Sequence, residues 1–288
     1  MGIELLQGIV SGFLVGLTYA LLSVGFSLTW GSTGVINISH AAFAVFAAYI
    51  GYFASAFLNL DPLIALIAIV PVFYLIGVGL NKSIFTRLSK KSKNIGFASM
   101  VLTFGIAVAL ENLMMWGFTA NPRLIKASYT LTSYKFGSVY VSGGQVIAAV
   151  LSLISLFLIY LFLYRTYTGK SVRAYEQEPA GAALTGINTA KVTSITLGIA
   201  LASAGVAGVS LSLLFPFEAT IHMDWLITIF LIVILGGVGS VVGTLLGGLA
   251  IGMIITISGV WVPYSLVNLV MFAILILILI IRTREVRI

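Results

Sequence analysis

The sequence predicts an all-α protein, a polytopic bundle of transmembrane helices, and its composition and run lengths carry this prediction. Of its 288 residues, 60% are hydrophobic and 8% are charged, whereas soluble domains contain roughly 25% charged residues. The apolar runs have the length of about 20 residues that a helix needs to cross a bilayer, and they lack the alternating pattern of barrel strands. Because lipid offers the backbone no hydrogen-bond partner, such runs must form helices.

The positive charges identify the cytoplasmic side of the predicted bundle. Of the fifteen Lys and Arg residues, twelve lie within 82–94, 165–191 and 282–288. Basic loops remain in the cytoplasm, so these stretches face the inside of a cell inner (plasma) membrane, and 118–142 and 216–224 face the outside. The charge flanks membrane segments and does not cover one face of a soluble domain, which argues against nucleic-acid binding.

We expect about eight membrane segments within one transmembrane domain that comprises residues 1–288. The apolar runs are 5–30, 41–58, 62–80, 95–117, 143–164, 192–214, 225–258 and 264–281. The first run lacks preceding basic residues and a cleavage site of small residues, so we expect a retained helix. The uncharged connection 31–40 leaves open on which side the N-terminus lies. Aromatic residues in the external loop 118–142 predict a partly ordered surface segment.

The seventh run, 225–258, is too long for one simple crossing and has Gly236, Gly237, Gly239 and Ser240 near its middle. We therefore predict a broken or re-entrant element. Unwound backbone is tolerated at membrane depth only where protein or a water-filled cavity receives it, so Gly237, Gly239 and Ser240 are candidates for a translocation pathway. The alternative is an unbroken glycine-rich helix packed tightly against a neighbour.

Small residues recur at four-residue spacing and predict close helix packing, because they let two helix backbones approach each other. The sequence does not decide between packing inside the chain and packing against a partner. The residues are Gly8, Gly12, Gly16 and Ala20, then Gly243 and Gly247, and Gly248 and Gly252. The chain contains no cysteine, which excludes disulfides and Cys-metal sites, and we predict no metal site.

A few polar residues fall in or beside the apolar runs and are further candidates for the pathway: Asn37, His40, Glu111 and Asn112. Each also has a structural interpretation, as a buried and hydrogen-bonded group. The alternative class is an ion-coupled secondary transporter, which would need acidic and His groups in several helices, and Glu111 with His40 does not form such a set. No nucleophile and base occur with motif support, so we do not predict an enzyme.

The cytoplasmic loop 165–191 contains the letters TGKS at 168–171, the second half of a phosphate-binding P-loop. Position 164 is Tyr where the motif needs Gly, and a membrane helix precedes it where the motif needs a strand. We therefore expect no nucleotide site here.

The second half of this loop predicts a short helix with a nearly bare surface. Pro179 fits the first turn, Glu176 and Glu178 lie at the positive N-terminal end, and Gly186 is placed to end the helix. Small residues at 180–183 would let this helix lie in a cleft of another protein. The alternative is a helical elbow that only joins two membrane segments.

Three places in the chain resemble the permease subunits of ATP-binding-cassette importers for branched-chain amino acids, a family that also includes urea and amide permeases. They are INISHAAF at 36–43, the loop from Gly169 to Ile187, and LGGVGS at 235–240 with the following Gly247 and Gly248. The chain departs from the family pattern at Ala41, where Gly is usual. Its loop also lacks the full Glu-Ala-Ala-x-x-x-Gly signature of other importer families.

The resemblance implies that the loop is a coupling helix that docks on a cytoplasmic ATPase. The candidate contact residues are Arg173, Glu176, Glu178, Pro179, Ala182, Ala183 and Gly186. The implied partners are a second homologous permease subunit, two ATPase subunits that hold ATP and Mg, an external solute-binding protein and membrane lipid. The chain itself would bind no cofactor. It resembles the smaller permease subunit, with aliphatic amino acids as substrates and urea or short amides as the alternative.

Overall fold

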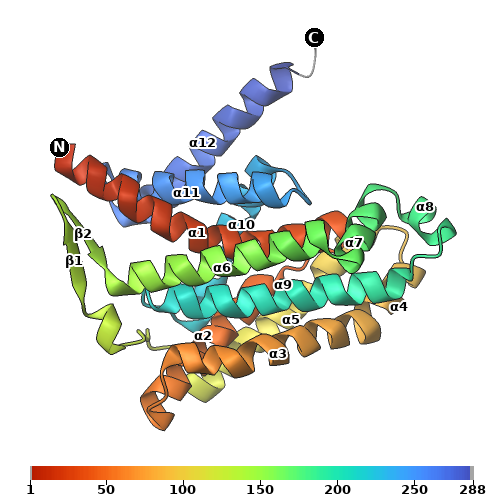
Figure 1. Ribbon diagram of the computed structural model, residues 1–288, viewed down its shortest axis with the longest axis horizontal. Coiled ribbons are helices and arrows are strands. Elements are labelled where there is room, and N and C mark those ends of the chain that lie inside the picture. The colour runs from red at the N-terminus through yellow and green to blue at the C-terminus, as the bar shows by residue number, and fades with distance from the viewer. Residues whose placement is uncertain (1, 286–288) are drawn as a thin grey trace.

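The computed structural model describes residues 2–285, and in it the chain forms a bundle of long helices (Figure 1). The predicted all-α membrane fold is confirmed, since eight helical stretches in this part are long and apolar enough to cross a bilayer. Arg287, part of the basic C-terminal stretch, lies outside the described residues. The long helices are α1 (Gly2–Thr33), α2 (Ser39–Leu58), α3 (Pro62–Leu80), α5 (Ile95–Phe118), α6 (Gly143–Arg165), α9 (Thr189–Ser212), α10 (His222–Gly236), α11 (Val241–Trp261) and α12 (Tyr264–Glu285).

Polar residues directly before the apolar runs set several helix starts. The Asp61 carboxylate accepts a hydrogen bond from Leu63 N at 2.8 Å, with Pro62 in the first turn of α3. Asn94, Asn188 and Ser240 cap α5, α9 and α11 in the same way. Such side chains satisfy N–H groups that the helix leaves without partners. The helices therefore begin within a few residues of the predicted boundaries.

α3 continues past its predicted end as a π-helical turn (Asn81–Phe85) and the short α4 (Thr86–Lys91). The buried Asn81 amide ties this continuation to α9, because its Nδ2 donates to Thr193 Oγ1 at 3.0 Å and to Ser194 Oγ at 2.9 Å. The basic stretch that begins at Lys82 is thus an extension of a membrane helix.

The side chain of Gln7 fixes the side of the membrane on which the N-terminus lies. Its Oε1 accepts from Tyr140 N at 2.8 Å, and its Nε2 donates to Tyr140 O at 2.6 Å. Tyr140 belongs to the loop 118–142, which the charge pattern places outside. The N-terminus is therefore external, and α1 runs inward (Figure 1).

The external loop folds into a two-stranded hairpin, β1 (Ser133–Phe136) and β2 (Val139–Ser142), with a left-handed turn residue at Gly137. A backbone bridge from Arg123 to Phe217 ties the start of this loop to the segment after α9. The aromatic residues of 118–142 predicted an ordered segment but not its strands. Each strand pairs over only four residues, which is too short to leave a clear pattern in the sequence.

The spaced glycines lie in contacts between helices of this chain. A Cβ on Gly12 would come within 2.7 Å of Met253 Cα, and a Cβ on Gly16 would come within 2.9 Å of Gly248 O. Gly8 faces Ile257 of α11 in the same row, and Gly247 packs against Ile232 O of α10. Gly243 meets the Gly236 backbone. The ridges thus join α1 to α11 and α11 to α10 inside the chain.

Candidate functional site

A segment of unwound backbone between α1 and α2 lies against α5. Ile36 N and Ile38 N donate to Ser99 Oγ at 3.0 Å and Thr103 Oγ1 at 2.9 Å, and Thr103 Oγ1 donates back to Ile36 O at 3.2 Å. Hydroxyl groups of a membrane helix thus replace the missing helical hydrogen bonds, as an apolar environment requires. Residues 34–38 were expected as an uncharged connection with Asn37 as a pathway candidate, and Ser99 and Thr103 were not singled out.

Asn37 and His40 sit where this unwound segment enters α2, and both are fully buried. Asn37 Oδ1 accepts from Ser39 Oγ at 2.6 Å. His40 Nε2 bonds to Leu22 O at 3.0 Å, so this nitrogen carries the proton, because a carbonyl can only accept. The Phe26 ring meets the imidazole edge at 5.9 Å between centroids. His40 therefore braces α2 against α1, whereas the Asn37 bond is local to the start of α2.

The predicted break in the seventh apolar run is present between α10 and α11. Gly237 and Gly239 have φ values of 91° and 84°, which L side chains rarely adopt. Gly239 N donates to Ser27 Oγ of α1 at 2.9 Å, and Ser240 Oγ caps α11 through Gly243 N at 3.0 Å. The break is thus a fixed turn tied to the cytoplasmic end of α1.

Glu176 lies on α7 (Tyr167–Gln177) and points at this break. A Cβ on Gly31 would lie 2.5 Å from Glu176 Oε1, and the same oxygen lies beside Gly239. Burial raises the pKa of the Glu176 carboxyl above its usual range. The sequence predicted Glu176 at the start of the docking helix, whereas it belongs to α7 and its half-buried side chain lies against the α10–α11 turn.

α7 is held to the end of α6 by residues that sequence reasoning had assigned otherwise. Arg173 Nε donates to Leu163 O at 3.1 Å, and the guanidinium lies 4.4 Å from the centroid of the Tyr164 ring. Gly169 packs on the α6 backbone, with 2.6 Å between its ideal Cβ and Leu163 Cα. The TGKS letters therefore belong to a helix packed closely on another helix. The half-buried Arg173 side chain, predicted as an ATPase contact, thus also contacts its own chain.

α8 (Pro179–Leu184) is the short helix that the sequence predicted, and with α7 it lies at the end of the bundle opposite the hairpin (Figure 1). The Glu178 carboxylate caps it by accepting from Ala180 N at 3.2 Å. Gly186, with φ 84°, follows its C-terminus, where Ile187 N donates to Ala182 O at 3.1 Å.

The exposed tip of α8 differs from the predicted bare surface around Ala182. Ala182 is buried against its own chain, whereas Ala183 is exposed and Leu184 is 89% exposed. An apolar side chain this exposed on the cytoplasmic side is a candidate contact for a partner. Sequence reasoning missed Leu184 because it looked for small residues.

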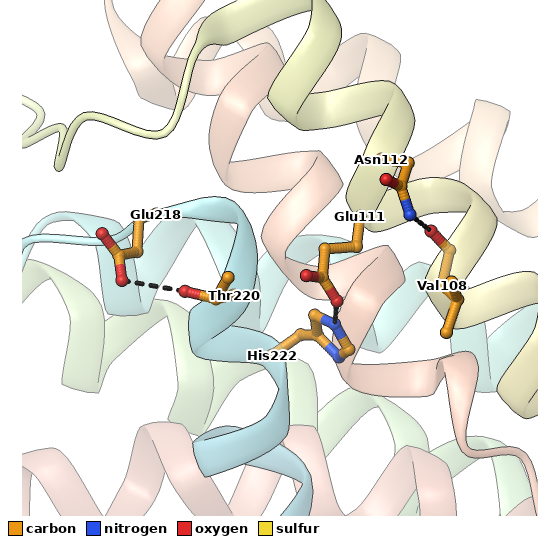
Figure 2. A network of polar contacts seen from close by, with 6 residues as sticks. All are labelled: Val108, Glu111, Asn112, Glu218, Thr220 and His222. Atoms are coloured by element: carbon orange, nitrogen blue, oxygen red, sulfur yellow. Dashed lines mark hydrogen bonds and ion pairs between the residues drawn. The ribbon is translucent and has the colours of Figure 1, made fainter.

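Glu111 forms a polar contact with a residue that the sequence did not single out. Figure 2 shows its Oε2 directed at His222 Nε2, at 2.8 Å. The His222 side chain is fully buried and that of Glu111 is 21% exposed. Asn112 does not join them, because its Nδ2 donates to Val108 O at 2.8 Å on an exposed face. His222 is the first residue of α10, so the pair ties α5 to α10 at their external ends.

These features define a class of protein: a multi-pass membrane permease, with unwound and broken segments among its helices and a short projecting helix on the cytoplasmic side. A family model described as branched-chain amino acid transport system / permease component matches residues 8–279. The chain belongs to this family, and it is a multi-pass protein of the inner membrane.

Relatives with known names are similar over most of this chain. The high-affinity branched-chain amino acid transport system permease protein BraD of Pseudomonas aeruginosa is 28% identical over 96% of this chain and 94% of its own length. The corresponding LivH of Escherichia coli K12 is 25% identical over 96% of this chain and 93% of its own length. A probable branched-chain amino acid permease protein LivH of Methanocaldococcus jannaschii is 26% identical over 81% of this chain and 74% of its own length. No solved structure matches the chain.

Proposed function

We propose that this chain forms part of the membrane path of an ATP-binding-cassette importer for branched-chain amino acids. The observation that carries the proposal is the family match over 8–279, which includes the α10–α11 turn and the whole segment from α7 to α9. The names of BraD and LivH support the same substrate class. The proposed complex adds a second homologous permease, two cytoplasmic ATPase subunits that bind ATP and Mg, and an external solute-binding protein.

In this proposal α8 is the contact for the ATPase, and α7 transmits its movement. Arg173 and Gly169 hold α7 against α6, so α7 and α8 can move together with the inner end of α6. Glu176 then conveys that displacement to Gly239 in the α10–α11 turn. Closure of the ATPase pair would in this way shift a turn of unwound backbone. Such a movement about a short turn is one way to alternate access between the two sides of the membrane.

The path itself is proposed near the two unwound segments, 34–38 and 237–240. Gly237, Gly239 and Ser240 are partly or fully exposed and can contribute backbone groups to a solute. The fully buried Asn37 and His40 would act by holding 34–38 in place. Glu111 would support α10 through His222, whereas the exposed Asn112 bonds only to its own helix.

The test is uptake in proteoliposomes that contain this chain, its second permease and the ATPase subunits. With ATP inside and a leucine-loaded binding protein outside, we expect leucine uptake that stops when either is omitted. Uptake of urea in place of leucine under the same conditions would move the substrate to the amide branch of the family. Leucine uptake by this chain alone, driven by an ion gradient, would overturn the proposal in favour of a secondary transporter.

A further inference from the structure

A groove between α3 and α9 opens on the lipid side of the bundle near its cytoplasmic end. The two helices lie side by side (Figure 1). They are in close contact at Gly77, where a Cβ would come within 2.8 Å of Gly198 Cα. The groove has a volume of about 550 Å³ and is lined by Tyr74, Leu75, Val78, Lys82, Thr86, Asn188, Ala190, Lys191, Ser194 and Ile195.

The lining changes from apolar to basic along the groove. Tyr74, Leu75 and Val78 are on its membrane side, and Leu75 is 65% exposed. Lys82, from the π-helical turn after α3, and Lys191, from α9, lie at its cytoplasmic end, and both are exposed. From Tyr74 to Lys82 the chain advances eight residues, which is about 12 Å of helix. That span reaches from the headgroup level into the hydrocarbon region.

The two lysines have no anionic partner among the residues that the structure describes. No carboxylate lines the groove, and neither ammonium makes an ion pair with any residue in the range 2–285. Hydrogen-bonding groups of Asn188 and Thr86 lie at the same end. Two unpaired ammonium groups and several polar side chains above an apolar cleft are complementary to a phosphate joined to acyl chains.

We propose that this groove, which we call the α3–α9 groove, binds an anionic phospholipid of the cytoplasmic leaflet. The headgroup phosphate lies between Lys82 and Lys191, and an acyl chain lies along Leu75 and Val78. The Asn81 amide holds the floor of the groove together through Ser194, so the cleft is shaped before the lipid arrives. A bound lipid would brace α3 against the start of α9, directly after the docking segment. The proposal does not depend on which solute the protein carries.

The test is lipid binding by the full-length chain in its purified transporter complex, in detergent. The probes are phosphatidylglycerol and phosphatidylcholine with the same acyl chains. We expect the complex to retain phosphatidylglycerol in preference, and the double substitution Lys82→Gln, Lys191→Gln to weaken its binding by on the order of tenfold. The control is Lys93→Gln, Lys170→Gln, which removes two exposed cytoplasmic charges outside the groove.

A second variant tests the apolar half of the groove. Leu75→Trp fills the cleft from a lipid-exposed position, and we expect it to weaken phosphatidylglycerol binding while both lysines remain. Equal losses in the control pair and the groove pair would show general attraction to basic loops and overturn the proposal. So would unchanged binding in Leu75→Trp, or displacement of the lipid by millimolar inorganic phosphate alone.

Discussion

The carboxylate of Glu176 on α7 lies against Gly239 in the turn between α10 and α11. This contact joins the cytoplasmic segment, which carries the proposed docking helix, to the one place where the seventh apolar run is unwound. Gly239 is also fixed to α1 by its hydrogen bond to Ser27. A displacement of α7 must therefore change the turn, or the Glu176 side chain must leave it.

The first prediction concerns space at this contact. Gly239→Ala would place a methyl group against the Glu176 carboxylate at a residue with φ 84°. Left-handed backbone costs an L-amino acid about 1–2 kcal/mol, and the new methyl group would also displace α7. We expect uptake in reconstituted vesicles to fall at least tenfold, while the amount of the variant protein in the membrane stays normal. The matched control is Gly105→Ala, where nothing lies within 4 Å of the new Cβ. Unchanged transport in Gly239→Ala would contradict a role for the contact.

The second prediction concerns pH. Burial raises the pKa of Glu176 in the folded protein, so the folded state binds the proton more tightly than the unfolded state does. The favourable contribution of the protonated form is therefore complete at low pH and is lost as pH rises through the raised pKa. We expect Glu176→Gln to match the wild type in thermal stability near pH 4 and to exceed it above the raised pKa. A stability difference that does not change with pH would contradict this assignment.

The third prediction places the ATPase contact on the tip of α8. Leu184→Asp puts a charge on a side chain that is 89% exposed, so the fold should tolerate it while an apolar contact with a partner is lost. We expect assembly with the ATPase subunits to weaken and ATP hydrolysis to lose its stimulation by the loaded binding protein. Ala183→Trp should act in the same direction by bulk.

Leu131→Asp is the matched control for this third prediction, since Leu131 is 77% exposed on the external side. Gly186→Trp is a poorer test, because φ 84° at Gly186 would strain the substituted chain whatever binds there. Full coupling in both Leu184→Asp and Ala183→Trp would exclude α8 as the contact.

Much of the fold could be predicted because a segment that crosses the lipid bilayer must be apolar, about 20 residues long and helical. Run length and charge predicted helices that begin within a few residues of the observed starts, and the glycines near 237 predicted the break. The unwound 34–38 segment was not predicted, because its backbone is satisfied by Ser99 and Thr103, more than sixty positions away. The residues next to this segment in the sequence do not indicate such distant partners.

The candidate site was predicted less completely for a related reason. Its position before the predicted docking helix singled out Glu176, but its partner Gly239 lies in the turn between α10 and α11, and only the folded chain brings them together. Likewise Ala182 and Leu184 are two positions apart in α8, and the packing of the loop decides which of them is exposed.

The last prediction concerns the pair Glu111 and His222 (Figure 2). His222→Ala removes the partner of a partly buried carboxylate and the only described side-chain bond between α5 and α10 among residues 2–285. We expect a loss of about 1–3 kcal/mol in stability, the usual cost of leaving a buried polar group unsatisfied. Glu111→Gln keeps a carbonyl oxygen that can accept from Nε2 and should cost less.

If the pair only ties the helices, Glu111→Gln transports normally once folded, and transport losses follow stability. If the carboxylate carries protons or cations, Glu111→Gln abolishes transport at unchanged stability, which Asn112→Ala, on its exposed face, does not. We expect the first result, because a single carboxylate and imidazole provide one bond and no relay across the membrane.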